Sequence, residues 1–195
     1  MEITTDQVKS LRAETKVSIM QCKKALEEAD GDAEKAKVLL RKQSAQIASK
    51  KQERTLGSGV IGSYTHNGGG VAAMIELLCE TDFVAKNEDF KKLAYEIAMH
   101  VAATAPEFVS KDEVKEEDTV KARAVFEKEA EGKPEEIKEK IIQGKLDSYF
   151  GEKILLEQAY IKNPEQTIAG LIAEAVQKFG EKTEIGRIVR FSVLE

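Results

Sequence analysis

The side chains best suited to catalysis or metal binding are scattered along this chain. Its 195 residues include two histidines and two cysteines. Neither His66 nor His100 has another histidine, cysteine or carboxylate at the spacing that a metal site or a catalytic relay requires. Cys22 and Cys79 form neither a disulfide framework nor a metal pattern, so we expect two reduced and mostly buried thiols. The sequence therefore predicts a protein that is not an enzyme and that holds no metal or cofactor.

One glycine-rich segment matches the pattern of a dinucleotide-binding loop. Residues 57–62 read G-S-G-V-I-G, which fits G-x-G-x-x-G. In that kind of site a strand precedes the glycines and a helix opens on the last one, so that helix N–H groups meet the pyrophosphate. Here a polar connector comes first and a β-branched, apolar run follows. We therefore expect a strand at this position and no nucleotide site.

Residues 81–87, T-D-F-V-A-K-N, set an acid beside a large aromatic at a predicted helix start directly after a strand. Thr81 is a favoured N-cap residue, and Asp82 suits the positive end of a helix dipole. Phe83 either packs into the protein's own core or projects from a short turn that ends where Asn87 caps a second helix. Capping chemistry fits both placements, and the shortness of the turn favours the second. An exposed aromatic residue flanked by charges is typical of a protein interface, so the segment predicts a protruding wedge rather than a catalytic pocket.

Three short helices are predicted in the N-terminal part of the chain. Residues 4–7 and 18–21 both fit the capping box S/T-x-x-E/Q, and Gly31 and Asp32 end one helix and cap the next. Helices of about 10 residues each would follow. Each carries one apolar stripe, formed by Val8 and Leu11, by Ile19, Cys22, Leu26 and Ala29, and by Ala36, Leu39 and Leu40. A three-helix bundle this small has little room for an active site, which indicates a docking role.

Residues 41–54 are basic and polar and are interpreted as a partly helical connector. An RNA-binding patch is the alternative, but no aromatic residues interleave with the cations to stack on bases. The cations concerned are Lys42, Lys50, Lys51 and Arg54. The formal net charge of -5 and the pI of about 5.4 also favour a protein partner over direct nucleic-acid contact.

The composition is that of a folded, water-soluble chain. Hydrophobic residues make up 42% and charged residues 33% of the sequence, as is usual in globular proteins. The first residues lack the basic start and the apolar run of a secretory signal, and no stretch approaches the roughly 18 apolar residues of a membrane span. We therefore expect a cytoplasmic protein without a membrane segment.

Beyond the connector the pattern predicts a small antiparallel sheet. Residues 60–66 and 71–78 are rich in β-branched and apolar side chains, and N-G-G-G between them supplies the positive-φ positions of a hairpin loop. Residues 187–193 alternate and are expected to form a third strand beside this hairpin. The residues that share one face of that strand are Val189, Phe191 and Val193.

Helices are predicted between these strands. From Asn87 to Pro106, apolar residues recur every three or four positions, as in an amphipathic helix covering one face of the sheet. Residues 112–143 carry dense, alternating charges, which indicate solvent-exposed helices broken near Gly132 and Pro134. A last helix is predicted over residues 167–179, with Leu171, Ile172 and Val176 pointing inward.

The sequence thus predicts an α+β protein in two domains. Residues 1–54 would form the three-helix docking domain and its connector. Residues 55–195 would form a core of a three-stranded antiparallel sheet covered by helices.

Two longer motifs stand in order along the chain. Residues 11–15 read L-R-A-E-T and lead through a short turn into S-I-M-Q-C-K-K-A-L at residues 18–26, and residues 81–86 read T-D-F-V-A-K. Together with the hairpin and residues 187–193, these motifs resemble elongation factor Ts, the guanine-nucleotide exchange factor of elongation factor Tu, over nearly the whole chain.

The resemblance implies a fold and a mechanism. The N-terminal helices would form a ubiquitin-associated-like bundle whose Ile19 and Met20 dock the GTPase domain of elongation factor Tu. Asp82 and Phe83 would enter the partner near its bound Mg²⁺, shift its helices and rearrange its phosphate loop, so that Mg²⁺ and then GDP leave. The residues implied at this contact are Thr81, Asp82, Phe83 and Val84.

The match is to short members of that family, which carry one core repeat and lack an extra C-terminal helical module. Short members are expected to pair into homodimers, because a two-fold dimer would restore the missing half. Lys16 and Ser18 stand where the pattern usually has glycine, and Gln21 stands where it usually has aspartate. Ser18 and Gln21 rebuild a capping box, so the second helix is still expected to begin there. Two rival functions are an RNA-binding protein and a helical adaptor for another protein.

Overall fold

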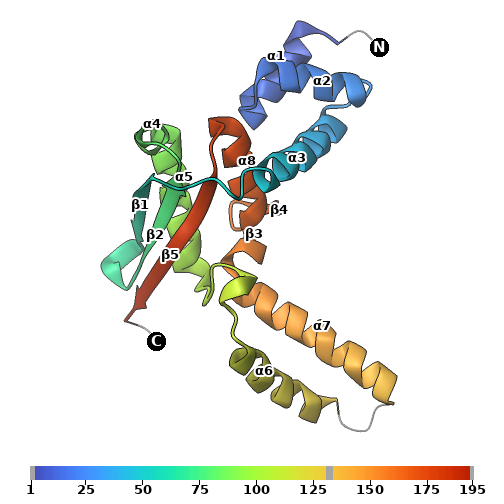
Figure 1. Cartoon of the computed structure of the whole chain (residues 1–195), viewed down its shortest axis with the longest axis vertical. Helices are drawn as coiled ribbons and strands as arrows, with labels where there is room; N and C mark the ends of the chain where they lie inside the picture. The colour runs from blue at the N-terminus through green and yellow to red at the C-terminus, as the bar shows by residue number, and fades with distance from the viewer. Residues whose placement is uncertain (1–2, 131–133, 194–195) are drawn as a thin grey trace. The chain divides into compact units, whose positions relative to one another are not determined.

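The computed structural model describes residues 3–130 and 134–193 and has the predicted α+β class (Figure 1). Its main sheet has three strands in the order β1-β2-β5, and a second, two-stranded sheet pairs β3 with β4. The chain divides into two compact units. The first contains the residues up to Ile61 together with Glu76–Ala94 and Ala169–Glu184, and the second contains Gly62–Ile75, Tyr95–Ile168 and the residues from Ile185 on. The predicted domain boundary at residue 54 stays a prediction.

The N-terminal bundle consists of α1 (Thr5–Thr15), α2 (Ile19–Glu28) and α3 (Ala33–Ser49). Its own hydrophobic core is formed by Val8, Leu11, Val17, Cys22, Ala25, Leu26, Ala29, Ala36 and Leu40. Ile19 was expected in that core, and this was wrong, because its side chain is 59% exposed at the first residue of α2. The third helix is longer than the expected length of about 10 residues, and its last turns are the helical part of the connector that was predicted to be partly helical. The helix continues to Ser49, because residues 41–49 are mostly good helix formers and Ser44 hydrogen-bonds Gln177 of α8 (Ile168–Phe179).

Capping residues begin all three helices as predicted. Thr4 forms the full capping box with Gln7. Ser18 accepts a hydrogen bond from the backbone N–H of Gln21, but its hydroxyl then donates to Gln21 Oε1 at 2.8 Å, so this box is only half formed. Asp32 accepts from two backbone N–H groups at the start of α3. The helix starts are therefore set by local side chains.

Lys16 ends α1 in the left-handed conformation, with φ of 57°. Its N–H donates to the carbonyl of Arg12 at 2.9 Å, as in a helix-terminating turn where glycine is usual. A lysine with this φ is strained by about 1 to 2 kcal/mol, whereas glycine adopts it freely.

We therefore expect Lys16→Gly to raise the free energy of unfolding. The gain should be about 0.5 to 1 kcal/mol, because the greater freedom of glycine in the unfolded chain offsets part of the relieved strain. Urea denaturation of the full chain measures it. Lys9→Gly in the interior of α1 is the matched control and should destabilise by about 1 kcal/mol. A loss of similar size in Lys16→Gly would contradict the argument.

The main sheet consists of β1 (Ser58–Thr65), β2 (Val71–Cys79) and β5 (Thr183–Ser192), joined through the 3-10 turn Asn67–Gly69 and later helices. Hydrogen bonds from Gly57 N to Cys79 O and from His66 N to Val71 O fix β1 antiparallel to β2. The predicted hairpin and third strand are confirmed, although β5 begins four residues earlier than the expected 187.

The glycine-rich segment lies at the start of β1 and not at a helix N-terminus. A Cβ atom on Gly59 would come within 2.6 Å of the carbonyl oxygen of Leu77 on β2. The glycine is therefore needed for the close approach of two strands, and the predicted strand at this position is confirmed.

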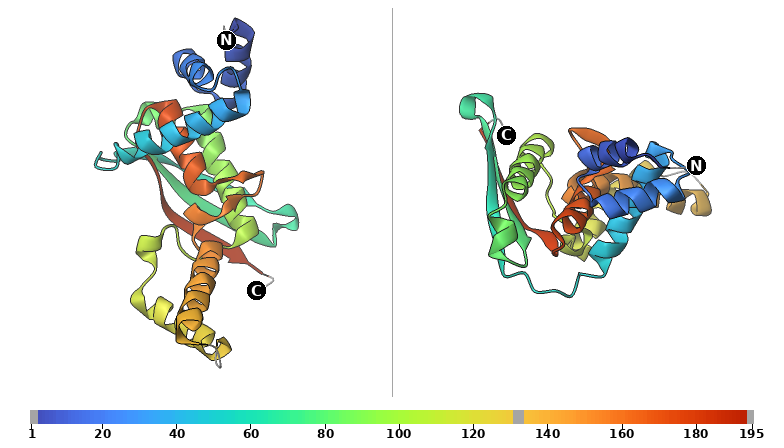
Figure 2. Two further views of the ribbon diagram at one scale, coloured as in Figure 1. Left: turned by 90° about the vertical axis from the view of Figure 1, so that its right-hand side faces the viewer. Right: turned by 90° about the horizontal axis from the view of Figure 1, so that it is seen from above.

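Two helices connect the hairpin to the second half of the chain. α4 (Asp82–Ala85) is a single turn after β2, and α5 (Glu88–Thr104) follows it. In the second unit α5 packs on the sheet (Figure 2). One contact between them is the hydrogen bond that Arg190 Nε of β5 donates to the carbonyl of Ala102, at 3.1 Å. The apolar positions predicted to face inward on α5 are buried, namely Phe90, Leu93, Ala94, Ile97, Ala98 and Val101.

The charged region folds as a helical hairpin of α6 (Glu116–Glu129) and α7 (Glu135–Lys153). Pro134 directly precedes α7 as predicted, whereas Gly132 lies outside the described residues. The two helices enclose a separate hydrophobic cluster of Ala122, Ala130, Ile142 and Leu146. The prediction of a purely wetted surface was therefore incomplete, because apolar residues sparse in sequence meet between the two helices.

The remaining elements are short. After the 3-10 turn Leu155–Glu157, β3 (Ala159–Tyr160) pairs antiparallel with β4 (Asn163–Thr167), a small sheet that was not predicted. A 3-10 turn over Lys111–Glu113 precedes α6. α8 matches the last predicted helix within one residue, with Ile172 and Val176 buried and Leu171 half-buried.

Candidate partner-binding site

The segment after β2 projects the aromatic side chain that the sequence singled out. Phe83 is 84% exposed, so its alternative placement in the protein's own core was wrong. The turn is held instead by Ala85, which is buried, and by Val84, which is half-buried. Asn87 begins α5 as expected, accepting a hydrogen bond from Asp89 N at 2.8 Å. A short turn between β2 and α5 thus presents the phenyl ring to solvent.

Asp82 is the exposed acid beside this ring. Its carboxylate accepts a hydrogen bond from Lys86 Nζ at 2.5 Å, one helical turn later. That bond, with the positive charge of Lys86, lowers the pKa of Asp82. The carboxylate is therefore ionised at neutral pH and able to meet a cation or a hydrogen-bond donor on another molecule.

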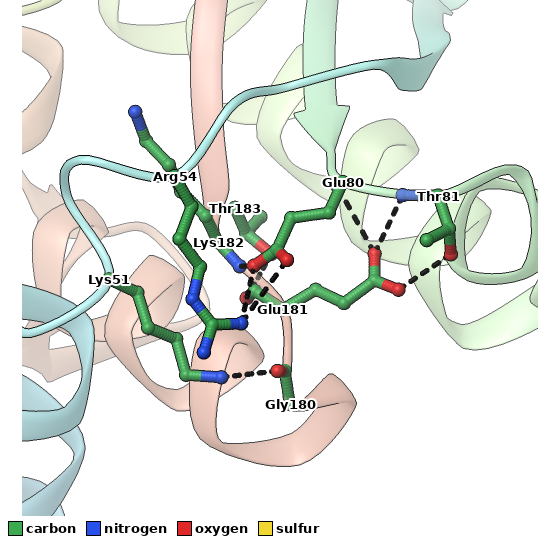
Figure 3. Close-up of polar contacts among 8 residues, drawn as sticks. All are labelled: Lys51, Arg54, Glu80, Thr81, Gly180, Glu181, Lys182 and Thr183. Atoms are coloured by element: carbon green, nitrogen blue, oxygen red, sulfur yellow. Dashed lines mark hydrogen bonds and ion pairs between the residues drawn. The ribbon is translucent and has the colours of Figure 1, made fainter.

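Thr81 stands at the N-cap position of α4, but its side chain makes no capping hydrogen bond. Its hydroxyl donates instead to Glu181 Oε1 at 2.6 Å, in the loop between α8 and β5 (Figure 3). The backbone N–H groups of Glu80 and Thr81 donate to Glu181 Oε2 at 3.1 and 3.0 Å. The predicted capping role of Thr81 was wrong, because a carboxylate distant in sequence takes its hydroxyl.

Glu80 is bound in turn by the same loop and by the connector. Its carboxylate accepts from Lys182 N at 2.5 Å and from Arg54 Nη1 at 3.2 Å (Figure 3). The backbone hydrogen bond from Lys182 is the main reason that the pKa of Glu80 is lowered, and Arg54 adds to the effect. Lys51 Nζ donates to the carbonyl of Gly180. The loop 180–182 is therefore hydrogen-bonded to the connector and to Glu80 and Thr81, which form the base of the wedge.

Ile19 and Met20 lie on another element of the first unit, the first turn of α2. Ile19 is 59% and Met20 is 81% exposed. Two adjacent apolar side chains open to solvent at a capped helix start are suited to insertion into a partner's surface. The structure thus places the predicted contact residues on two separate elements, α2 and α4.

Comparison with known proteins decides the family. The sequence profile of the family described as Elongation factor TS matches residues 3–195. This chain belongs to the elongation factor Ts family. It is 44% identical over 195 residues to elongation factor Ts of Heliobacterium modesticaldum, covering 99% of this chain and 91% of that protein. It is also 44% identical over 197 residues to that of Coprothermobacter proteolyticus, covering 100% of both. Elongation factor Ts of Carboxydothermus hydrogenoformans is 45% identical over 195 residues, with 99% of this chain and 90% of that protein covered.

His100 and the two cysteines of this elongation factor Ts family member are buried within the fold. His100 is buried, donates from Nε2 to Gln158 Oε1 at 2.8 Å and accepts at Nδ1 from Ile161 N at 3.4 Å. Burial lowers the pKa of His100 and keeps the ring neutral. Both thiols are buried and free, as predicted. Within residues 3–130 and 134–193, no group of three or more His, Cys, Asp or Glu side chains could hold a metal ion.

Two of the four cations proposed for RNA binding make intramolecular contacts. Arg54 pairs with Glu80 at 3.2 Å, and Lys51 binds the carbonyl of Gly180. Cations engaged in this way are poor candidates for phosphate contacts, which weakens the RNA alternative. None of the helices in the described part of the chain has the length and apolar character to cross a bilayer.

Sequence reasoning missed Glu181 and its neighbours. Glu181 and Thr81 are 100 residues apart, and no local pattern connects them. A glutamate after a glycine in a loop has no special signature. Only the pairing of β5 beside β2 brings this loop to the base of the wedge.

Proposed function

We propose that this chain is the guanine-nucleotide exchange factor of elongation factor Tu and promotes release of Mg²⁺ and GDP from it. The observation that carries the proposal is the projection of Phe83, 84% exposed beside the ionised Asp82, in a member of the elongation factor Ts family. Such a factor works by binding, and makes or breaks no covalent bond. We place its action in the cytoplasm, with the GDP-bound and nucleotide-free forms of elongation factor Tu as its partners.

The proposed contact has two parts. Ile19 and Met20 dock the GTPase domain of elongation factor Tu, and the wedge residues enter it near the bound Mg²⁺. The wedge residues are Thr81, Asp82, Phe83 and Val84. The phenyl ring displaces partner helices, while the Asp82 carboxylate disturbs the metal's surroundings. In this proposal residues 1–54 act as the docking domain and residues 55–195 as the core that presents the wedge and forms the dimer.

The energetics require both parts. Burying one phenyl ring contributes roughly 1.5 to 3 kcal/mol, and each 1.4 kcal/mol of coupling weakens nucleotide binding about tenfold. The ring by itself therefore accounts for about one to two powers of ten. The bundle contact adds the binding free energy that holds the two proteins together while the ring enters. By linkage, GDP weakens the hold of this protein on its partner by the same factor as this protein weakens GDP binding.

Stopped-flow release of a fluorescent GDP from elongation factor Tu tests the proposal. Release should accelerate and saturate as the concentration of this protein rises, and excess Mg²⁺ should slow it. Release that stays at the spontaneous rate at every concentration would reject the exchange function. The same assay with residues 1–54 alone separates exchange from an adaptor role, because the bundle lacks the wedge.

We further propose a homodimer whose interface is an apolar face of the sheet in the second unit. Met74 on β2 is 46% exposed, and Val189, Phe191 and Val193 on and after β5 are 37%, 68% and 79% exposed. The three residues of the last segment alternate along it, and the hydrogen bond from Val193 N to Gly70 O places Val189 opposite Met74 on β2, so all four share one face of the sheet. An exposed apolar face of this kind indicates an interaction site, and a second copy would supply the same apolar face to cover it.

Phe191→Asp should shift the protein from dimer to monomer. In a two-fold interface the change occurs twice, so the dimer dissociation constant should rise about a hundredfold or more. Sedimentation equilibrium measures it, with Val38→Asp on α3, where Val38 is 62% exposed, as the charge-matched control. A wild-type protein that is monomeric at high concentration, or a Phe191→Asp variant that dimerises normally, would contradict the interface.

A further inference from the structure

The wedge is held at its base by a residue that belongs to neither proposed contact. Phe83 is 84% exposed, so almost none of its position is set by packing of its own side chain. Its direction depends on the backbone that precedes it. That backbone, at Glu80 and Thr81, donates two N–H hydrogen bonds to one carboxylate oxygen of Glu181 (Figure 3).

Thr81 is fixed on each of its polar groups. Its N–H and its hydroxyl donate to the two oxygens of Glu181, at 3.0 and 2.6 Å. Its carbonyl accepts from Cys79 Sγ at 3.2 Å and from Ala85 N at 3.2 Å. The Thr81 hydroxyl binds Glu181 and therefore does not cap α4. Thr81 thus gives up the capping hydrogen bond that is usual at its position for a hydrogen bond to a residue far away in sequence. This exchange indicates that the hydrogen bonds to Glu181 stabilise the orientation of the turn.

The loop that carries Glu181 is itself anchored. Glu80 accepts from Lys182 N at 2.5 Å and from Arg54 at 3.2 Å, and Lys51 binds the carbonyl of Gly180. The carboxylates of Glu80 and Glu181 therefore form reciprocal bonds: each binds backbone N–H groups of the other's segment (Figure 3). Reciprocal bonds of this kind fix two chain segments more firmly than a single contact between side chains.

We propose that Glu181 is a positioning residue that pre-orients residues 81–83 for entry into the partner. It touches neither the partner nor the nucleotide in this role, which rests on the proposed exchange function. Without it the turn samples more directions, and fewer encounters place Phe83 correctly after docking. Docking through Ile19 and Met20 is unaffected, because that surface lies on α2.

Two variants separate hydrogen bonding from charge. Glu181→Ala removes all three bonds. Glu181→Gln keeps them, because its amide oxygen accepts from both N–H groups while its NH₂ donates to the Thr81 hydroxyl oxygen. Glu184→Ala is the control, since Glu184 is an exposed acid in the same region whose partner is Lys182 at 3.0 Å.

The first measurement does not depend on exchange activity. Amide hydrogen exchange of the free protein, measured residue by residue by NMR, should accelerate about tenfold at Glu80 and Thr81 in Glu181→Ala, the effect of losing one hydrogen bond to a charged acceptor. Exchange in α5 and β2 should stay unchanged, which shows that the variant is folded. Glu184→Ala should match the wild type, and Glu181→Gln should lie between the wild type and Glu181→Ala, because its neutral amide oxygen accepts weaker bonds than a carboxylate.

The second measurement is GDP release from elongation factor Tu. Glu181→Ala should lower the maximal stimulated rate about tenfold and leave the half-saturating concentration unchanged, and Glu181→Gln should restore much of the rate. A wild-type maximal rate in Glu181→Ala, or a loss in Glu181→Gln as large as in Glu181→Ala, would overturn the positioning role. If the wild-type protein itself fails to stimulate release, the exchange function falls, and the amide measurement still decides whether Glu181 orders the turn.

Discussion

Phe83→Ala is expected to lower the maximal rate of stimulated GDP release from elongation factor Tu by about tenfold to a hundredfold. The range follows from the roughly 1.5 to 3 kcal/mol that burial of a phenyl ring contributes, if that burial occurs only in the partner. Because the ring is 84% exposed in this protein, its removal leaves the fold intact. Stopped-flow measurements at saturating concentration report the rate, and urea denaturation reports the unchanged stability.

Two controls define what the ring does. Phe83→Leu keeps most of the apolar volume and should retain more of the rate than Phe83→Ala. Val38→Ala removes an exposed apolar side chain from α3 and should change nothing. An unaltered maximal rate in Phe83→Ala would remove the ring from the mechanism. A large loss of stability would mean that the side chain packs in the protein's own interior.

Met20→Asp is expected to weaken docking without altering the maximal exchange rate. Met20 is 81% exposed in the first turn of α2, where an aspartate suits the positive end of the helix dipole, so the bundle stays folded. A charge buried in an apolar interface removes about 2 kcal/mol or more of binding free energy, as for other interface anchors. The concentration for half-maximal stimulation should therefore rise about thirtyfold or more.

Concentration dependence of GDP release distinguishes this effect from that of Phe83. Val38→Asp, with the same charge change at a 62% exposed position of the bundle, is the control and should behave as the wild type. A drop in the maximal rate at an unchanged half-saturating concentration would reverse the roles assigned to α2 and α4.

The parts of this fold that follow from local chemistry were predictable. Ser18 and Asp32 cap their helices, Asn87 starts α5, and the glycines after His66 close the hairpin. Each of these depends on residues within a few positions of one another, so a single sequence contains the information. The exposure of Phe83 was only partly predictable in this way, because the short turn favoured it while capping chemistry also fitted a ring packed in the protein's own core.

The parts that depend on distant segments were not predictable. Helix α3 is longer than predicted, in part because Ser44 contacts Gln177, and Thr81 does not cap α4, because Glu181 takes its hydroxyl. Ile19 has helical spacing to the bundle core, yet its side chain is 59% exposed. For α3 and Thr81 an interaction between residues far apart in sequence overrides a local preference, and no periodic pattern encodes it.

The hydrogen bonds that Glu181 accepts bear on how this activity could be transferred to another scaffold. Grafting residues 81–87 alone would carry the aromatic and the acid but leave behind the acceptor of their backbone N–H groups. An active graft has to include the loop 180–182 as a second segment, held beside the first at the distance between neighbouring strands. The smallest part that can be grafted with its activity is therefore a pair of neighbouring loops. Peptides with the sequence of residues 81–87 should reproduce the activity of the whole protein poorly.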